Sequence, residues 1–304
     1  MCVGDKIVTE KIYDLVIIGG GCAGLTAAIY AFRAGLSFRL IEREVLGGKL
    51  NLISKINNFP GYNEISGYEL ADKIIRQLPI YKHVEHDCIS KADFKNPVKS
   101  IYGDKNEYKS KSVIIATGSK EKSLKIEDEN IYGIWHCELC DGVMVKDKDV
   151  AIIGGGDSAF TCAIYLSNIC KKVHILVRGP HPRANNILVE EVNNLSNVFI
   201  HYTTSLKAIT QEGKNIKSII CQQIGNEITI ECQGIYVKIG QEPSIGFEAG
   251  IPKDDIGFFD YDTKTPGVFV AGDCVSKDVK QIVTACSDGA NAAINAFFFI
   301  SKNF

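Results

Sequence analysis

The alternation of apolar and polar positions repeats itself along the chain. Residues 16–43 read as an apolar run, a glycine cluster, a stretch with apolar positions at helical spacing, and a second apolar run. Residues 151–178 read the same way, 135 positions later, and 10 of the 28 aligned positions are identical. A strand, a turn, an amphipathic helix and a second strand make a β-α-β unit of a parallel sheet. The pattern therefore predicts two such units.

Each unit carries small residues between its first strand and its helix, in the spacing G-x-G-x-x-G/A. They are Gly19, Gly21 and Gly24 in the first unit, and Gly154, Gly156 and Ala159 in the second. Such a turn lets the backbone approach a pyrophosphate, and the helix N-terminus supplies free N–H groups for the phosphates. One match is weak evidence, but two in register favour dinucleotide binding. We therefore expect an α/β fold with two Rossmann-like domains.

Composition narrows the class of protein. The chain has 304 residues, 45% of them hydrophobic and 23% charged, as in a globular protein with room for two domains. A formal net charge of −2 gives no general attraction to nucleic acid or to an anionic membrane. The first fifteen residues lack a secretory signal, and the apolar run at 293–300 is too short to span a bilayer. We expect a cytoplasmic protein.

The eleven cysteines include one C-x-x-C pair, Cys137 and Cys140. A structural zinc site needs four soft ligands, and no second C-x-x-C or matching histidine pair accompanies this one, so no metal is expected. A disulfide across so short a loop constrains the unfolded chain little. We therefore interpret the pair as a redox-active dithiol. The other nine cysteines are interpreted mostly as small buried hydrophobic residues.

Three further features concern the dinucleotide. Glu42 ends the second strand of the first unit, where an acid can accept hydrogen bonds from both ribose hydroxyls of FAD or NAD. Residues 112–119 and 265–274 are apolar strands that end in small residues. With these segments the chain resembles the two-dinucleotide flavoprotein disulfide reductases. The resemblance implies that Ala-Thr-Gly at 116–118 closes the sheet of the FAD domain and that Asp273 reaches the ribityl–phosphate part of FAD.

Over essentially its whole length, the chain resembles low-molecular-weight thioredoxin reductase. The resemblance implies an FAD-binding domain made of residues 1–118 and 241–304, with an inserted NAD(P)H-like domain at 119–240 that carries the dithiol. It also implies thioredoxin as partner and a homodimer. The residues that would contact FAD are Gly19, Gly21, Ala23, Gly24, Glu42, Gly48, Lys49, Leu50, Asn58, Ala116, Thr117, Gly118, Gly272, Asp273, Lys280, Gln281 and Ile282.

The same resemblance assigns roles at the dithiol. Cys140 would face the flavin, Cys137 would attack the partner's disulfide, and Asp141 would move a proton. The simpler alternative for Asp141, capping the next turn, does not exclude that role. A dithiol packed against the flavin cannot also reach a second protein. We therefore hypothesise that the insert rotates about chain crossings near Gly118 and Gly240.

The electron donor is where the chain departs from its relatives. Val177 ends the second strand of the second unit, where an acid would favour NAD. The family's H-R-R-x-x-x-R clamp for the NADPH 2′-phosphate is Val-Arg-Gly-Pro-His-Pro-Arg at 177–183, which retains Arg178 and Arg183. The family's paired glutamates are Thr161 and Cys162. Nicotinamide recognition is thus altered while the FAD and dithiol features persist.

With these changes the chain resembles the flavin-type ferredoxin–thioredoxin reductases, which take electrons from ferredoxin. We predict reduced ferredoxin as donor and thioredoxin as acceptor, with FAD as cofactor. The first alternative is an NADPH-dependent thioredoxin reductase with a relaxed 2′-phosphate site. The residues of that site would be Gly154, Gly156, Ala159, Arg178 and Arg183. A further alternative is a small-molecule dithiol oxidase, which would run the same cysteine pair in the opposite direction.

Overall fold

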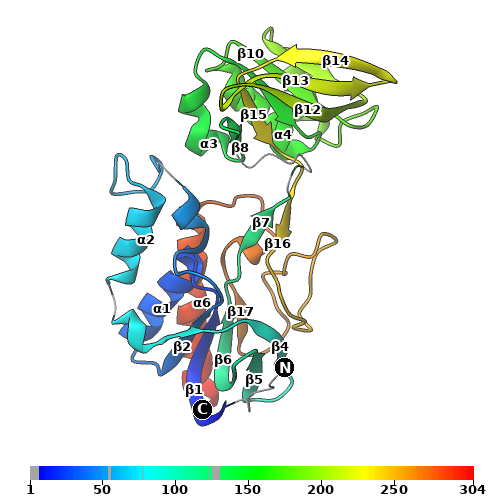
Figure 1. Cartoon of the computed structure of the whole chain (residues 1–304). Helices are drawn as coiled ribbons and strands as arrows, with labels where there is room; N and C mark the ends of the chain where they lie inside the picture. Colours follow the sequence, from blue (N-terminus) through cyan, green and yellow to red (C-terminus); the bar gives the residue numbers. More distant parts are fainter. Residues whose placement is uncertain (1–6, 54–55, 78, 123, 125–130) are drawn as a thin grey trace, which may run out of the picture. The chain divides into compact units, whose positions relative to one another are not determined.

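The computed structural model describes residues 7–53, 56–77, 79–122, 124 and 131–304, apart from the side chains of residues 7–10, 80 and 140. Its internal contacts divide the chain into two units. Unit 1 comprises 1–120 and 242–304, and unit 2 comprises 121–241 (Figure 1). The chain crosses between them along β7 (Ser119–Glu121) and β16 (Gln241–Pro243), which pair as a two-stranded sheet.

Unit 1 is built on a seven-stranded sheet in the order β3-β2-β1-β6-β5-β4, with β17 also paired to β6. Strands β3, β2, β1, β6 and β17 run parallel, whereas β5 and β4 are antiparallel. Their bounds are β1 (Ile7–Ile18), β2 (Phe38–Glu42), β3 (Val84–His86), β4 (Ile89–Asp93), β5 (Lys99–Gly103), β6 (Asn106–Ile115) and β17 (Val268–Val270).

Helices α1 (Cys22–Arg33) and α6 (Ile282–Asn303) lie side by side against this sheet (Figure 1). They approach closely because small residues line their contact. A Cβ at Gly289 would lie only 2.1 Å from the carbonyl oxygen of Ala23, so no larger residue fits there. Helix α2 (Gly67–Ile75) and the 3-10 turns η1 (Gly48–Leu52), η2 (Ile80–Lys82) and η4 (Gly272–Cys274) complete the described helices of unit 1.

Unit 2 holds a five-stranded parallel sheet in the order β11-β10-β9-β15-β8, and an antiparallel sheet β12-β13-β14. The parallel strands are β8 (Ile134–Trp135), β9 (Asp149–Ile153), β10 (Lys172–Leu176), β11 (Val198–His201) and β15 (Gly234–Val237). The antiparallel strands are β12 (Thr204–Glu212), β13 (Asn215–Gln223) and β14 (Asn226–Glu231). The helices are α3 (Glu138–Asp141), η3 (Gly142–Val145), α4 (Asp157–Ser167) and α5 (Asn186–Asn193).

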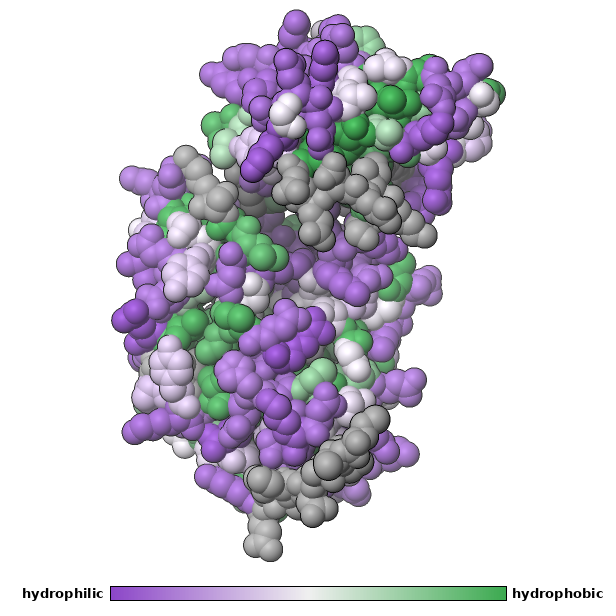
Figure 2. All heavy atoms as spheres, in the orientation of Figure 1, coloured by the Kyte–Doolittle hydropathy of each residue, from purple (hydrophilic) through white to green (hydrophobic). Residues whose placement is uncertain are grey.

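Both predicted β-α-β units are present, as β1-α1-β2 and β9-α4-β10. The predicted α/β fold with two Rossmann-like units is thus confirmed. Hydrophilic residues cover most of the face drawn in Figure 2, and the apolar residues on it form small separate groups. Within the described ranges, no helix combines the length and the apolar character needed to cross a membrane.

Candidate redox site and dinucleotide-binding turns

The first glycine turn is shaped so that only glycine fits at two of its positions. A Cβ at Gly19, whose φ is +105°, would lie 2.4 Å from the carbonyl oxygen of Ala116, and a Cβ at Gly24 would lie 1.8 Å from the carbonyl oxygen of Gly19. Gly21, in contrast, has no atom within 4 Å of its Cβ position. It is the N-cap of α1, which has no side-chain cap and no acid in its first turn. Uncapped N–H groups therefore face open space that suits an anion.

Glu42 is fixed beside this turn. Its side chain is buried, Oε2 accepts a hydrogen bond of 2.6 Å from the Gly20 amide, and Oε1 accepts one of 2.8 Å from the Glu44 amide. A carboxylate oxygen has more than one acceptor site. Both oxygens can therefore still accept hydrogen bonds from vicinal hydroxyls while the amides hold the carboxylate in place.

The loop after β2 folds back onto the turn. The Gly47 amide donates to the Gly20 carbonyl at 2.8 Å, and the Cβ position of Gly48 lies 3.3 Å from the Cα of Gly21. Lys49 Nζ donates to Ser119 Oγ at 3.0 Å and lies 3.9 Å from Asp273 Oδ2. Leu50, which was predicted to contact FAD, has its side chain buried in the core around α1.

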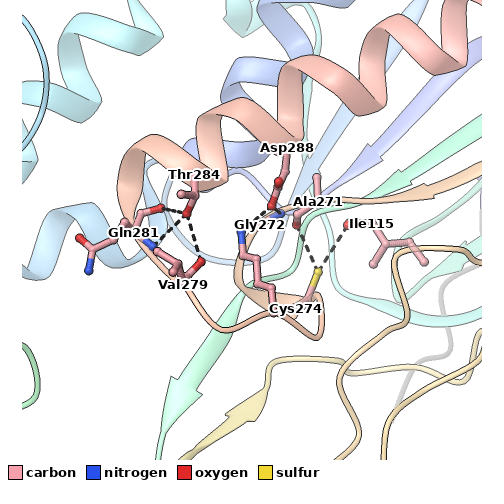
Figure 3. A network of polar contacts seen from close by, with 9 residues as sticks. Ile115, Ala271, Gly272, Cys274, Val279, Gln281, Thr284 and Asp288 are labelled. Carbon is pink, nitrogen blue, oxygen red and sulfur yellow. Dashed lines mark hydrogen bonds and ion pairs between the residues drawn. The ribbon is translucent and has the colours of Figure 1, made fainter. Parts of the chain in front are cut away.

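Gly272, which follows β17, contacts residues of both α1 and α6. Its amide donates to Asp288 Oδ2 at 3.0 Å (Figure 3). Its Cβ position lies 2.9 Å from the Cβ of Ala23. Lys277 Nζ forms an ion pair with the same Asp288 carboxylate at 2.5 Å. The predicted segment Ala116, Thr117 and Gly118 continues β6 here, and Gly118 has a φ of +71°. Asp288 and Lys277 were not predicted, because an acid inside a helix has no distinctive sequence pattern.

The start of α6 brings together residues that are distant in sequence. Gln281 caps the helix, and its amide donates to Thr284 Oγ1 at 3.1 Å (Figure 3). Its Oε1 accepts a hydrogen bond of 3.2 Å from Asn58 Nδ2. Ile282 is the first residue of the helix. Lys280 Nζ lies 3.2 Å from the ring centroid of Phe258. Burial lowers the pKa of Lys280, while Asp273 opposes that effect.

These groups fit the donor and acceptor pattern of FAD. The open helix N-terminus at Gly21 suits a diphosphate, the anchored carboxylate of Glu42 suits a ribose, and Lys49 and Lys280 place positive charge around Asp273. All of these residues belong to unit 1.

The dithiol segment lies in unit 2, between β8 and η3. Cys137 is the N-cap of α3 and is disulfide-bonded. The side chain of Cys140 lies outside the described residues. The Cys137–Cys140 pairing therefore stays a prediction. The described cysteines with free thiols are Cys22, Cys88, Cys162, Cys170, Cys221, Cys232, Cys274 and Cys286.

Lys238, which follows β15, holds the chain on both sides of Cys137. Its Nζ donates to the His136 carbonyl at 2.7 Å and forms an ion pair with Glu138 Oε2 at 2.5 Å. Both charged side chains are only 13% exposed. The sequence reasoning missed this pair, although an acid inside the C-x-x-C was a signal that a cation would be needed nearby. Lys238 places a positive charge next to the segment that carries the disulfide.

Asp141 keeps its role as a candidate proton donor. Its amide donates to the Cys137 carbonyl at 3.0 Å, and burial raises the pKa of its carboxyl group. It is the N-cap of η3 but makes no side-chain capping hydrogen bond. Among the described residues, the Tyr236 hydroxyl is buried without a hydrogen-bond partner. Burial raises the pKa of Tyr236, and the nearby charges of Asp141 and Glu138 add to the effect.

The second glycine turn repeats the backbone of the first. The Cβ position of Gly154 lies 2.3 Å from the Lys238 carbonyl oxygen, and Gly156 again has no atom within 4 Å. The Cβ position of Gly155 lies 2.9 Å from Val177 Cγ1. The Arg183 amide donates to the Gly155 carbonyl at 2.6 Å.

The side chains around this second turn include the residues that differ from the family's nicotinamide-binding pattern. Arg178 and Arg183 are exposed, as is Thr161 in α4. Cys162 and Ala159 are fully buried, and burial raises the pKa of Cys162, with a further contribution from Glu138. Across the part of the chain that the structure describes, no group of three or more His, Cys, Asp or Glu is placed to hold a metal ion.

Comparisons with known proteins agree with this geometry. The family model described as pyridine nucleotide-disulphide oxidoreductase matches residues 13–289. The thioredoxin reductase of Mycoplasma genitalium is 36% identical, over 94% of this chain and 94% of that protein. The crystal structure of thioredoxin reductase from Streptococcus pyogenes has a TM-score of 0.87 and 33% identity, and covers 97% of this chain and 100% of its own. A ferredoxin-flavin thioredoxin reductase from Clostridium acetobutylicum has a TM-score of 0.51 and 25% identity, with 96% and 99% covered.

Proposed function

Because the chain belongs to the thioredoxin reductases of the pyridine nucleotide-disulphide oxidoreductase family, we propose that it reduces thioredoxin through FAD and a Cys137–Cys140 disulfide, with reduced ferredoxin as electron donor. The observation that carries the proposal is the disulfide-bonded Cys137, clamped by Lys238 in one unit, together with an open, glycine-lined turn in the other. FAD supplies, when bound, a carrier that accepts single electrons and delivers a pair.

The chain's own residues carry the exchange with thioredoxin. In the reduced protein, the Cys137 thiolate attacks one sulfur of the thioredoxin disulfide, which forms a mixed disulfide and releases one thiolate of thioredoxin. Asp141, whose pKa is raised by burial, provides a proton for that thiolate. The Cys140 thiolate then attacks Cys137 Sγ, re-forms the Cys137–Cys140 disulfide and releases reduced thioredoxin. Lys238 binds the residues on either side of Cys137, and we expect its positive charge to favour the Cys137 thiolate.

The choice of ferredoxin rests on the second glycine turn. Its strand ends in Val177, which cannot accept a hydrogen bond from a ribose, and α4 presents Thr161 and the buried Cys162 where relatives have two acids. One solved relative is itself named a ferredoxin-flavin thioredoxin reductase. A ferredoxin near −400 mV lies about 130 mV below a thioredoxin near −270 mV, which makes two-electron transfer favourable by roughly 6 kcal/mol.

NADPH is the second candidate donor, and one observation favours it. Arg178 and Arg183 are both exposed beside a turn that is open at Gly156, so a 2′-phosphate could reach them. A homodimer is also part of the proposal, on family resemblance alone.

An anaerobic titration separates the two donors. The holoprotein is mixed with stoichiometric NADPH or with reduced ferredoxin, and flavin absorbance is followed. We expect ferredoxin to bleach the flavin promptly and NADPH to do so at least ~10-fold more slowly. Prompt bleaching by NADPH would reverse the donor assignment and leave the thioredoxin assignment standing.

Replacing either cysteine of the pair tests the acceptor side. Cys137→Ser and Cys140→Ser should each lower thioredoxin reduction by at least ~100-fold, because neither serine can form a disulfide. Flavin reduction by the donor should persist in both variants. Cys88→Ser, at an exposed free thiol, is the matched control and should retain activity. Undiminished turnover in either test variant would exclude the proposed exchange.

A further inference from the structure

Two cysteines outside the C-x-x-C are brought together by the packing of α1 against α6. Cys22 is the first residue of α1, directly after Gly21, and Cys286 lies in the second turn of α6. Cys286 Sγ lies 4.0 Å from the carbonyl oxygen of Cys22, although the two residues are 264 positions apart. Most of the described free cysteines outside the C-x-x-C are buried, as predicted, whereas Cys22 and Cys286 are partly exposed.

The close approach is a property of the backbones. A Cβ at Gly289, one turn after Cys286, would lie 2.1 Å from the carbonyl oxygen of Ala23. Ala285, on the other side of Cys286, is buried, and its Cβ lies 3.8 Å from the Cβ position of Gly272. Small residues thus flank Cys286 on α6 and let the backbones of the two helices approach closely beside both thiols.

The two thiols also interact chemically. Cys22 hydrogen bonds to Cys286, which lowers the pKa of Cys286 to about 7, and Thr26 contributes in the same direction. The same hydrogen bond, together with burial, raises the pKa of Cys22. Thr26 Oγ1 is held in the first turn of α1 by its 2.7 Å hydrogen bond to the Cys22 carbonyl. Cys286 is therefore the nucleophile of the pair, and Cys22 is positioned to resolve it.

We propose that Cys22 and Cys286 form a second redox-active dithiol, which hydroperoxide converts into a disulfide that links the phosphate-binding helix α1 to α6. The Cys286 thiolate attacks one oxygen of hydrogen peroxide, which breaks the O–O bond, gives a sulfenic acid and releases hydroxide. The Cys22 thiol then displaces the sulfenic oxygen as water and forms the S–S bond. In sum, two thiols lose two electrons and two protons, and one peroxide becomes two molecules of water.

The disulfide would close a long loop. It would join residues 22 and 286, which belong to the two separate chain segments of unit 1, and so would hold those segments together. A cross-link between distant positions stabilises a fold by restricting its unfolded state. We therefore expect oxidation to raise the thermal midpoint of the holoprotein by ~5 °C or more. The inference is independent of the electron donor and of the exchange at Cys137.

Peptide mapping of the oxidised holoprotein tests the proposal directly. Trypsin should release residues 12–33 and 281–302 as separate peptides, and each contains a single cysteine. The holoprotein is treated with hydrogen peroxide, alkylated, and digested without reductant. We expect the two peptides to be recovered as one disulfide-linked species, which dithiothreitol separates. Recovery of both peptides in alkylated form, or of Cys286 as a sulfinic or sulfonic acid only, would overturn the proposal.

The stability effect has its own control. Peroxide also oxidises other thiols, so the shift in thermal midpoint is compared between wild type, Cys286→Ser and Cys88→Ser. The increase should be retained in Cys88→Ser, because Cys88 is an exposed thiol outside the pair, and lost in Cys286→Ser. Equal shifts in all three proteins would assign the stabilisation to a different disulfide and contradict the inference.

Discussion

Gly20 and Gly155 occupy the same position in the two glycine turns and face different side chains. The Gly20 amide donates to the Glu42 carboxylate at 2.6 Å, whereas the Cβ position of Gly155 lies 2.9 Å from a methyl group of Val177. The two turns share other backbone features, including a following loop whose amide donates a hydrogen bond to the carbonyl of this glycine. Both copies of the repeat thus keep the backbone turn that suits a dinucleotide. The hydrogen bonds that each turn can offer depend on the residue that ends the adjacent strand.

A second difference lies at the residue whose carbonyl packs over the first glycine of each turn. In unit 1 this residue is Ala116, and in unit 2 it is Lys238. The alanine only continues β6. The lysine also extends to the dithiol segment, where it binds the His136 carbonyl and Glu138. The second turn is therefore tied to the segment that carries the redox pair.

The largest expected effect is on FAD affinity, when Glu42 beside Gly20 or Val177 beside Gly155 is replaced. Glu42→Ala should weaken FAD binding by ~10- to 100-fold, because it removes charge-assisted hydrogen bonds to ribose and the anchor of the Gly20 amide. Val177→Ala, its matched control in the second turn, should leave FAD affinity within ~2-fold. Titration of the apoprotein with FAD measures both. Similar losses of FAD affinity in the two variants would contradict the assignment of FAD binding to the first turn.

The next effect is a gain at the second turn. Gly179→Arg restores a cation of the family's 2′-phosphate clamp, and the site has room because the Cβ position of Gly179 lies 3.4 Å from the nearest atom, the His181 carbonyl oxygen. We expect the second-order rate of flavin reduction by NADPH to rise by ~10-fold. Gly179→Gln controls for size without charge and should give no such gain. An unchanged rate in the arginine variant would mean that the missing cation does not limit the rate of flavin reduction by NADPH.

Lys238 gives a smaller effect, on stability. Lys238→Met leaves Glu138 without its cation at a site where both side chains are 13% exposed, which should destabilise the protein by ~1–3 kcal/mol. Adding Glu138→Gln should recover most of the loss, because no charge is then left unpaired. Urea unfolding of wild type and the two variants measures this. A double variant less stable than Lys238→Met alone would argue against an ion pair as the cause.

Asp141 gives the smallest effect, which depends on pH. Burial raises the pKa of its carboxyl above the usual 3.8, so the folded state binds the proton more tightly than the unfolded state does. The wild type therefore loses stability as pH rises from 3.8 through the raised pKa. Asp141→Asn lacks this loss and should melt ~1–3 °C higher at pH 7, with a smaller difference at pH 4. Thermal melts at several pH values check it, and a difference that grows toward low pH would contradict the assignment.

Sequence reasoning succeeds where a backbone position restricts the residue type. Gly19 and Gly24 are predictable because a Cβ would collide with a carbonyl oxygen at each of them. The repeat then locates the second turn at Gly154 by the same argument. Glu42 is predictable as well, since it ends a strand at a fixed spacing from the turn.

Contacts between distant segments are not predictable in this way. Lys238 and Glu138, like Cys22 and Cys286, come together only through strand order and helix packing. Glu138 inside the C-x-x-C indicates that a cation is needed nearby, but nothing in the sequence identifies Lys238 as that cation or Cys286 as the partner of Cys22. The contact of Asn58 with Gln281 spans 223 positions, and the two residues were predicted to lie at one site only through a family resemblance.

The pairing of β17 with β6 has a consequence for synthesis on the ribosome. The first segment of unit 1 ends at residue 120, but its last strand and α6 come from the segment that starts at 242. At about 5–20 residues per second, translation of the 121 intervening residues takes on the order of 6–24 s. Throughout that interval the apolar side of α1 and one edge of β6 lack their native cover. A chaperone that binds apolar segments would therefore protect the nascent chain during this interval.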